Sequence, residues 1–340
     1  MRSRGNSPML IGHRGAPGHR PEHSRSSYLR AFAAGVDAVE PDLVPTRDGV
    51  LVVRHESEIG ATTDVSAHPE FADRRVTKTI DGVELTGWFT EDFTWEELST
   101  LRCRERIPAL RPDNRAFNDT EPVLRFTELL DLLEEHNATA ERPVGLVAEI
   151  KHPTYFGTCG FDMACMTRRA LTGRPWGEGG YPLWYECFER TALLHLAEHS
   201  VTGKLIYLID DQGAAPDDVA VLGERAHPYS DALTLEGLSD LSEMIDGISP
   251  SWRCLISTSQ SALGQSRGVV ERAHEVGLSV FTWTLRPENY FLAEGWTSSM
   301  DPARWGNWRG EFSAILDTGV DAVFADYPEL VTELLAEEPR

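Results

Sequence analysis

Short apolar runs, each ending in polar or charged residues and followed by a helical pattern, recur along the chain. This alternation is typical of βα units and a parallel sheet. Because eight such runs occur, a closed (β/α)₈ barrel of the TIM type is the most economical arrangement, and we expect one α/β domain over residues 1–340. The predicted strands are Met9–His13, Asp37–Leu43, Gly145–Ile150, Leu183–Cys187, Lys204–Ile209, Met244–Ile248, Leu278–Thr284 and Asp321–Ala325.

Between these runs, apolar residues recur at helical spacing. In Ser24–Ala34, the side chains of Tyr28, Leu29, Phe32 and Ala33 fall on one face of a helix. Similar patterns predict four more helices. They span Phe126–Glu135, Thr234–Glu243, Arg267–Val276 and Pro328–Ala336.

The interval between the second and third predicted strands, residues 44–144, is far longer than a plain βα crossover requires. We expect residues 56–118 to be an insertion. Because βα loops emerge at the catalytic face of a barrel, the insertion should lie over the active-site face as a lid or wall. Within it, Thr94 and Glu97 fit the capping-box pattern and predict the start of a short helix.

The balance of charges narrows the classes of partner. The chain has 54 acidic and 32 basic residues, a formal net charge of −22 at pH 7. Nucleic acids and anionic membranes repel a negative surface, so we expect neither as a partner. No stretch reaches the roughly 18 apolar residues of a membrane span, and stable membrane insertion is therefore not expected.

The cysteines and the N-terminus bear on the compartment. The five cysteines are odd in number and form no CxxC pair, which favours free thiols in a reducing cytosol over a disulfide framework or a zinc site. The basic start, Met1–Gly5, is not followed by an apolar signal core. We therefore expect a cytoplasmic protein without a signal peptide. The oligomeric state stays open.

Three carboxylates lie at the ends of neighbouring predicted strands. Glu40 and Asp42 are two positions apart, so both side chains project to one face of the strand. Glu149 lies at the matching height of the next strand. Such groups repel one another unless a cation lies between them, and carboxylates suit Mg²⁺ or Ca²⁺. A single acidic residue here would more simply be a surface charge, but three at one depth predict a site for one divalent cation.

Two histidines and two cations lie close to this predicted site. His13 ends the first strand, and His55 follows soon after the second. Two imidazoles that titrate near neutrality can share the proton transfers that a phosphodiester cleavage requires. Arg14 and Lys151 can hold phosphoryl oxygens. The alternative for these two cations is simple pairing with Glu40 or Glu149.

In their order and spacing, these residues resemble the glycerophosphodiester phosphodiesterase family over nearly the whole chain. The segment from Phe89 to Pro108 resembles the longer bacterial and plant branch of that family, which carries the insertion. The matching pieces are His13-Arg14-Gly15, Pro21-Glu22-His23-Ser24, Glu40-x-Asp42, Thr46-x-Asp48-Gly49-Val50, His55-Glu56, Glu149-Ile150-Lys151, Phe281-Thr282-Trp283-Thr284, Gly319 to Phe324 and Ala325-Asp326-Tyr327-Pro328.

The resemblance implies a (β/α)₈ barrel that hydrolyses glycerophosphodiesters, small-molecule substrates, to glycerol 3-phosphate and an alcohol. It implies that His13 and His55 are the general acid/base pair. It places Trp283 at the substrate pocket, although barrel-mouth core is the alternative for this side chain. The remaining roles implied are metal binding by Glu40, Asp42 and Glu149 and phosphate binding by Arg14 and Lys151.

The fourth predicted strand departs from the family. It ends Glu186-Cys187-Phe188-Glu189, where many relatives have Gln-Ser-Phe followed by an acidic residue. We place Glu186 and Phe188 in the substrate pocket. Glu186 replaces a neutral amide, and three roles stay open for it: a further metal ligand, a group that binds a cationic head group, or a neutral acid whose pKa is raised by nearby carboxylates.

Two other functions remain as alternatives. One is phospholipase D-like cleavage of lysophospholipids, against which the acidic surface and the lack of a basic amphipathic helix count. The other is a non-catalytic phosphodiester-binding barrel, which is disfavoured because every expected catalytic position is filled. The choice between Mg²⁺ and Ca²⁺, the preferred alcohol, and direct water attack versus a cyclic phosphate intermediate stay open.

Overall fold

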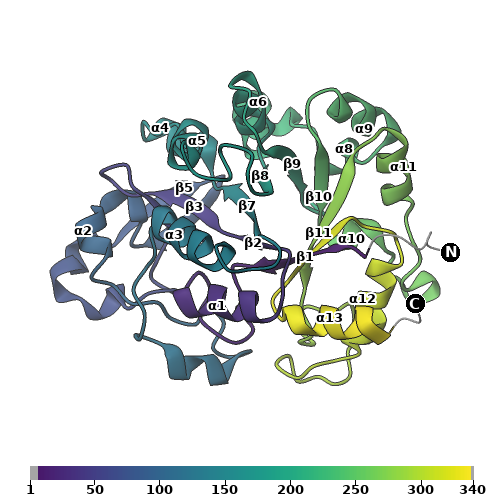
Figure 1. Cartoon of the computed structure of the whole chain (residues 1–340), viewed down its shortest axis with the longest axis horizontal. Coiled ribbons are helices and arrows are strands. Elements are labelled where there is room, and N and C mark those ends of the chain that lie inside the picture. The colour runs from purple at the N-terminus through teal and green to yellow at the C-terminus, as the bar shows by residue number, and fades with distance from the viewer. Residues whose placement is uncertain (1–6, 338–340) are drawn as a thin grey trace.

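The computed structural model of the chain describes residues 7–337, which form a closed barrel of parallel strands surrounded by helices (Figure 1). The barrel strands are β1 (Met9–His13), β2 (Ala38–Glu40), β3 (Asp42–Pro45), β7 (Gly145–Ile150), β8 (Leu183–Cys187), β9 (Lys204–Ile209), β10 (Gly247–Pro250), β11 (Ser279–Leu285) and β12 (Ala322–Ala325). The ring closes because β1 pairs with both β12 and β2, and β2 and β3 both pair with β7. The predicted (β/α)₈ barrel is confirmed.

The second strand differs from its prediction. The sequence pattern gives one strand over Asp37–Leu43, whereas the structure has β2 and β3 on either side of Pro41. Proline has no N–H to donate to a strand ladder and its ring fixes φ, so a regular strand breaks there. β3 continues into an antiparallel hairpin with β4 (Leu51–Val53). This hairpin returns the chain to the barrel mouth at His55.

The sixth strand begins later than predicted. Met244–Ile248 is wrong as a strand over most of its length, because β10 starts at Gly247. The N–H groups of Met244 and Ile245 donate to the carbonyl of Leu241, at 2.9 and 3.0 Å. These two residues therefore complete the turn that ends the preceding helix, where the side chain of Ile245 is buried and that of Met244 is exposed.

The five predicted helices are confirmed, with small shifts at their ends. In α1 the N-cap is Ser24, whose side chain accepts a hydrogen bond from the Ser27 N–H. The α-helices that surround the barrel are α1 (Arg25–Ala33), α3 (Phe126–Asn137), α4 (Pro153–Thr158), α5 (Met163–Leu171), α6 (Arg190–Glu198), α7 (Pro216–Leu222), α8 (Tyr229–Ala232), α9 (Leu235–Ser242), α10 (Trp252–Leu255), α11 (Val269–Glu275), α12 (Trp308–Leu316) and α13 (Pro328–Glu337).

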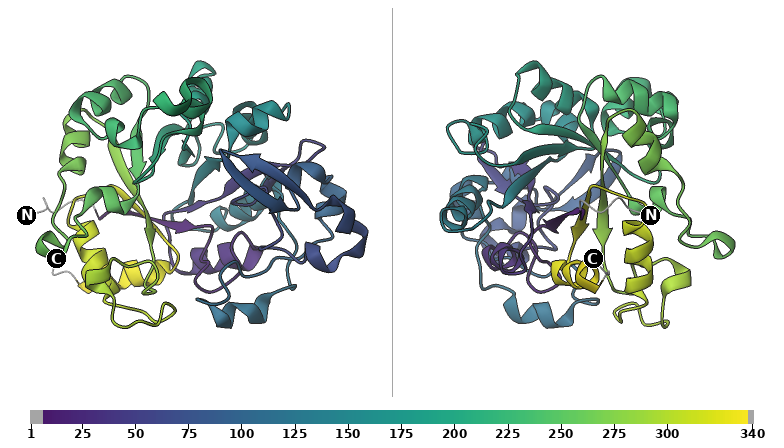
Figure 2. Two further views of the ribbon diagram at one scale, coloured as in Figure 1. Left: turned by 180° about the vertical axis from the view of Figure 1, so that it is seen from behind. Right: turned by 45° about the vertical axis from the view of Figure 1, so that its right-hand side comes forward.

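Residues 56–118 lie beside the barrel, in blue at the left of Figure 1 and at the right of the left-hand view in Figure 2. The predicted capping box is confirmed, because the side chains of Thr94 and Glu97 each accept the other's backbone N–H at the start of α2. The segment contains the hairpin of β5 (Val76–Ile80) and β6 (Val83–Gly87), the helix α2 (Trp95–Leu98), and the 3₁₀ turns η1 (Val65–Ala67), η2 (Pro69–Arg74), η3 (Thr90–Asp92) and η4 (Pro112–Phe117).

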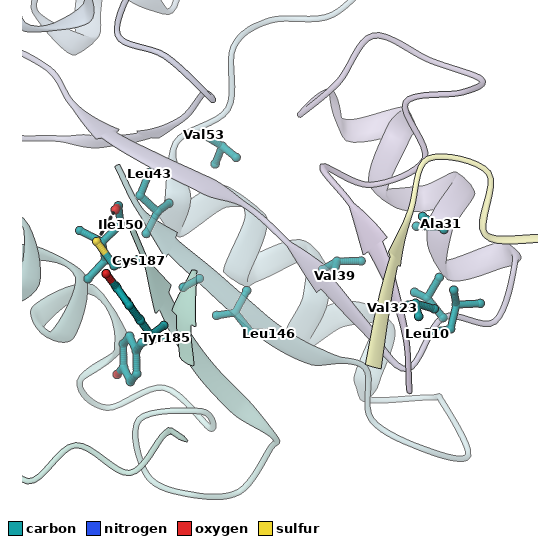
Figure 3. Packing of buried hydrophobic residues seen from close by; sticks show 14 of the residues in the cluster. Leu10, Ala31, Val39, Leu43, Val53, Leu146, Ile150, Tyr185, Cys187 and Val323 are labelled. Carbon is teal, nitrogen blue, oxygen red and sulfur yellow. Dashed lines mark hydrogen bonds between the residues drawn. The ribbon is translucent and has the colours of Figure 1, made fainter. Parts of the chain in front are cut away.

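The apolar side chains form two layers. Outside the strands, a continuous core joins the sheet to the helices; in Figure 3, Leu10 and Val323, paired in register, lie near Ala31 of α1. Inside the barrel, a smaller apolar cluster fills the part nearer the amino ends of the strands. Its buried members are Ile11, Ala38, Val147, Ile206, Phe281, Ala322 and Phe324.

Within residues 7–337, no helix combines the length and the apolar character that crossing a bilayer requires.

Candidate active site

Alternate residues of a strand point to the same side, so each barrel strand presents a column of side chains to the interior. In five strands, an apolar or aromatic residue low in the barrel is followed, two positions later, by an ionisable one near the carboxyl end. These pairs are Ile11 and His13, Ala38 and Glu40, Val147 and Glu149, Trp184 and Glu186, and Phe324 and Asp326. The ionisable layer lies at the end of the barrel where enzymes of this fold place their sites.

Glu40, Asp42 and Glu149 converge in this layer. All three are buried, and each offers an oxygen within 4.8 Å of the others'. Asp42 and Glu149 are aligned in the β3–β7 register. Oε1 of Glu40 and Oδ1 of Asp42 are buried and have no hydrogen-bond partner within residues 7–337. Orphaned carboxylate oxygens are costly in a protein interior, and a hard divalent cation would satisfy them.

The pKa of Glu40 reflects the crowding of negative charge in this group of carboxylates. Burial, followed by the repulsion of Asp42 and Glu149, raises the pKa of Glu40 well above its usual range. For Asp42, burial opposes ionisation, but Lys151 and other neighbouring positive groups hold its pKa well below the usual range. The donor set therefore fits a divalent ion, which would restore the charge of Glu40.

Glu186 lies in the same layer, paired in register with Glu149. Its Oε2 is buried without a hydrogen-bond partner among the described residues, and burial with the nearby carboxylates raises its pKa well above the usual range. It is not part of the compact group of three carboxylates. The three roles expected for Glu186 all require such an unpaired oxygen.

His13 is held by a carboxylate from the last barrel strand. Its Nδ1 lies 2.6 Å from Oδ1 of Asp326, and the other oxygen of that carboxylate, Oδ2, accepts hydrogen bonds from Arg111 at 2.6 Å and Arg286 at 2.7 Å. Burial, together with Arg14, lowers the pKa of His13 to about 4. Burial opposes ionisation of Asp326, but Arg286 and Arg111 keep its pKa well below the usual range. A charged Asp326 requires the proton on Nδ1, which leaves Nε2 of His13 as the basic nitrogen.

His55 has a similar partner from its own segment. Its Nδ1 lies 2.6 Å from Oε1 of Glu56, and Arg106 donates to that carboxylate at 2.7 Å. Loss of hydration, followed by the positive charges of Arg14 and Lys151, lowers the pKa of His55 to about 3. The backbone N–H of the preceding residue donates to the carbonyl of Asp42, which places His55 beside the carboxylates.

The two cations are paired with carboxylates in this structure. Nζ of Lys151 lies 2.7 Å from Oε1 of Glu149, and Nε of Arg14 lies 3.2 Å from Oδ2 of Asp42. Arg14 also donates to Glu22 at 3.1 Å, and its backbone N–H donates to Glu40 at 2.9 Å. The pairing that was one alternative is thus present for Lys151, and both cations remain beside the carboxylate group.

Aromatic side chains occupy another part of the mouth. Trp283 and Phe188 pack edge to face with ring centroids 5.6 Å apart, and both are half-buried. The indole N–H of Trp283 donates to the carbonyl of Ser249 at 2.8 Å. Nζ of Lys151 lies 5.8 Å from the ring centroid of Phe188. The aromatic pair is therefore next to the charged group.

A small cavity of about 210 Å³ opens beside the two histidines. It is lined by His13, Arg14, Pro17, Glu22, His55, Glu105, Arg106, Ile107, Arg111, Arg286, Phe291 and Asp326. A larger cavity of about 960 Å³ lies at the opposite end, against Met9, Asp37, Trp184 and Asp321 at the starts of strands. The smaller cavity is the one that adjoins the ionisable layer.

Several residues of the site were not assigned from the sequence. Asp326 lies two positions after Phe324, so the alternation that identified the other strand-end carboxylates would have found it. His23, with φ of 57°, contacts Asp42 and Tyr28, each at 2.8 Å, and only the motif around it gave a signal. Arg106 and Arg111 lie in an irregular segment with no periodic pattern. Arg106 lies within the segment that resembles the longer branch of the family, but no pattern assigned a role to either arginine.

The sequence is similar to those of known proteins over nearly the whole chain. The chain is 29% identical to a glycerophosphodiester phosphodiesterase of Arabidopsis thaliana, over 94% of this chain and 84% of that protein. It is 25% identical to a glycerophosphodiester phosphodiesterase of Treponema pallidum, over 98% of this chain and 93% of that protein.

Solved structures share the fold. A putative glycerophosphoryl diester phosphodiesterase of Silicibacter pomeroyi superposes with a TM-score of 0.65 at 20% identity, covering 99% of this chain and 95% of that one. A phosphodiesterase of Oleispira antarctica, solved in complex with the product sn-glycerol-3-phosphate, superposes with a TM-score of 0.63 at 17% identity, covering 97% of each chain.

The profile of the Glycerophosphoryl diester phosphodiesterase family matches residues 13–330, a range that contains every residue of the site described above. The family predicted from the motifs is confirmed, and with it the class of phosphoric diester hydrolase. The chain belongs to the glycerophosphoryl diester phosphodiesterase family.

Proposed function

We propose that this chain hydrolyses glycerophosphodiesters to glycerol 3-phosphate and an alcohol, in a reaction that depends on one divalent cation, Mg²⁺ or Ca²⁺. The observation that carries the proposal is the group of three buried carboxylates next to two histidines and two cations. In two of the three, Glu40 and Asp42, one oxygen has no hydrogen-bond partner among the described residues, although Nζ of Lys151 lies 3.4 Å from that of Asp42. The placement of the group at the carboxyl ends of the barrel strands and the family of the chain both support the proposal.

Glu40, Asp42 and Glu149 are the residues that would hold the cation. When bound, it supplies positive charge that polarises the phosphoryl group. Binding would also relieve the mutual repulsion that raises the pKa of Glu40. Lys151 and Arg14, now paired with these carboxylates, would turn part of their hydrogen-bonding capacity to the phosphoryl oxygens.

His13 and His55 carry the proton transfers. Both are neutral near pH 7 because their pKa values are lowered to about 4 and about 3, so each can accept a proton. A bound phosphodiester brings negative charge that raises the pKa of both imidazoles. With the diester bound, one imidazole takes up a proton from solvent and later donates it to the departing alkoxide. The other, still neutral, takes the proton of the attacking nucleophile, whether that is water or a hydroxyl of the substrate.

The aromatic pair, Trp283 and Phe188, with Glu186 beside it, forms the proposed pocket for the alcohol. Its half-buried rings offer an apolar wall, and the unpaired oxygen of Glu186 offers an acceptor for a hydroxyl or a cationic group. The substrate is thus a small molecule whose phosphate lies at the carboxylate group and whose alcohol lies against the rings.

The proposal is tested with a panel of glycerophosphodiesters, including glycerophosphocholine and glycerophosphoethanolamine, assayed for release of glycerol 3-phosphate. We expect release with Mg²⁺ or Ca²⁺, none with chelator, and none from the variant Asp42→Asn. Asp240→Asn, which changes an exposed acidic residue far from the mouth, is the matched control. Absence of metal-dependent release from every diester would refute the proposal. Cleavage only of lysophospholipid micelles, seen as release of the head-group alcohol with lysophosphatidic acid as the other product, would favour the phospholipase D-like alternative.

A further inference from the structure

Two arginines of the predicted insertion reach the catalytic end of the barrel. Arg106 donates to both oxygens of Glu22, at 2.6 and 2.8 Å, and to Glu56 at 2.7 Å. Arg111 donates to Glu288 at 2.8 Å and to Asp326 at 2.6 Å. Each guanidinium therefore joins two carboxylates that come from different parts of the chain.

In both cases, one of the two carboxylates is the partner of a candidate catalytic histidine. Glu56 accepts from Nδ1 of His55, and Asp326 accepts from Nδ1 of His13. The structure thus contains two similar series of contacts. Each leads from an arginine of the insertion, through a carboxylate, to an imidazole. Both series start in one short segment, residues 105–111. Packing of a loop against a barrel would not by itself require two of them.

The geometry makes these contacts suited to orientation. A guanidinium is planar and presents its donors in a rigid fork, so a carboxylate that it binds has little freedom to rotate. Asp326 and Arg111 are almost fully buried, with side chains 1% and 3% exposed. A carboxylate held in this way fixes the tautomer and the ring orientation of its histidine.

We propose that Arg106 and Arg111 are positioning residues, which hold Glu56 and Asp326 and through them orient His55 and His13. Residues 105–111 of the predicted insertion then help to complete the catalytic site. The proposal rests on the proposed function, because it takes His13 and His55 as the acid/base pair.

The first test compares Arg106→Gln and Arg111→Gln with Arg104→Gln. Arg104 belongs to the same segment but pairs at the surface with Asp119, so it is a matched control. We expect kcat to fall about 10-fold to 100-fold in the two test variants, with KM changed less than about threefold, and no change in the control. An equal fall in the control, or a rise in KM with kcat unchanged, would overturn the proposal.

A second test asks through which carboxylate each arginine acts. If Arg106 acts through Glu56, then Arg106→Gln should have less than about a threefold effect in a Glu56→Gln background, because coupled residues are not additive. The same holds for Arg111→Gln in an Asp326→Asn background. Full additivity would overturn the proposal, since it would show that Arg106 acts through Glu22 or on stability alone.

A third measurement does not depend on activity. Nuclear magnetic resonance of ¹⁵N-labelled histidine reports the tautomer of each imidazole, and we expect the Nδ1–H form of His13 in the wild-type chain. Arg111→Gln should mix the two tautomers, whereas Arg111→Lys, the milder variant if the first does not fold, should mix them less. Unchanged tautomers would refute the positioning role, whether or not the chain proves to hydrolyse glycerophosphodiesters.

Discussion

The two histidine–carboxylate pairs at the barrel mouth are alike in length but are assembled differently. His13 and Asp326 are 313 positions apart and meet only because β1 and β12 close the barrel. His55 and Glu56 are neighbours in the sequence. The side chains of the first pair are 10% and 1% exposed, and those of the second are 29% and 30% exposed.

This difference separates what the fold supplies from what the local sequence supplies. The pair at His13 requires the first and the last strands together, and its carboxylate is supported by two guanidinium groups. The pair at His55 can form wherever these two residues occur, and within residues 7–337 one guanidinium, that of Arg106, supports it. We therefore expect the first pair to be coupled to global stability and the second to depend on its loop.

The largest effect is expected for Asp326→Asn. The amide no longer favours the proton on Nδ1 of His13, and it leaves Arg111 and Arg286 without their shared charge. We expect kcat to fall about 10³-fold or more, by the loss of the correct tautomer. The free energy of unfolding should fall by about 3–5 kcal/mol, as when one partner of a buried ion pair is removed. Kinetics and urea unfolding measure both, and a variant of wild-type stability would contradict the coupling to the fold.

The next largest effect is expected on the stability of the protein when the pH is lowered, because the buried His13 then takes up a proton. The pKa of His13 is lowered from 6.5 to about 4, so between these values the unfolded chain binds a proton that the folded chain excludes. The contribution of His13 to stability is therefore full above about pH 6.5 and is lost as the pH drops towards 4, by up to about 3 kcal/mol. His55, whose pKa is lowered to about 3, contributes in the same direction over a window that extends to lower pH. His13→Asn should show a flatter decline than the wild type. Parallel curves for the two proteins would show that His13 is not the residue responsible.

A smaller effect is expected for Glu56→Gln. The pair is partly exposed and local, so the loss of stability should be below about 1 kcal/mol. Because the neutral amide still restrains His55 weakly, kcat should fall about 10-fold to 100-fold, at least as far as in Arg106→Gln. The same assays measure both quantities. An effect as large as that of Asp326→Asn would remove the distinction between the two pairs.

Added salt should have the smallest effect on stability, and that effect should differ clearly between the two histidine–carboxylate pairs. Raising ionic strength from 0.1 to 1 M shortens the Debye length from about 10 Å to about 3 Å, which screens exposed pairs far more than buried ones. The stability cost of Glu56→Gln should fall by a few tenths of a kcal/mol in 1 M NaCl, whereas that of Asp326→Asn should persist. Denaturant unfolding of both variants at the two salt concentrations decides this, and equal salt sensitivity would contradict the difference in burial.

The barrel could be predicted because its strands and helices repeat a strong apolar pattern, and the three carboxylates because they end strands that the pattern located. The break at Pro41 was missed, since the apolar run continues through it. Asp326 lay within reach of the same argument as Glu40, but it was treated only as part of a motif. The pairing of Lys151 with Glu149 was foreseen as an alternative.

The rest of the site depends on contacts that no local pattern encodes. Arg106 and Arg111 lie in a segment without regular structure, so their positions follow from how residues 56–118 fold against the barrel. An arginine can lie on the surface or in a site, and only the carboxylates that its guanidinium contacts distinguish the two cases. Such partners come from distant parts of the chain and become visible once the fold is known.

The apolar cluster inside the lower barrel has a consequence for the discovery of inhibitors. Ile11, Val147, Phe281 and Phe324 are almost fully buried and separate the large cavity at one end from the ionisable layer at the other. A compound that occupied the larger cavity would therefore contact none of the residues of the ionisable layer. Competitive compounds must instead enter through the smaller opening at the mouth, where guanidinium groups favour an anionic scaffold.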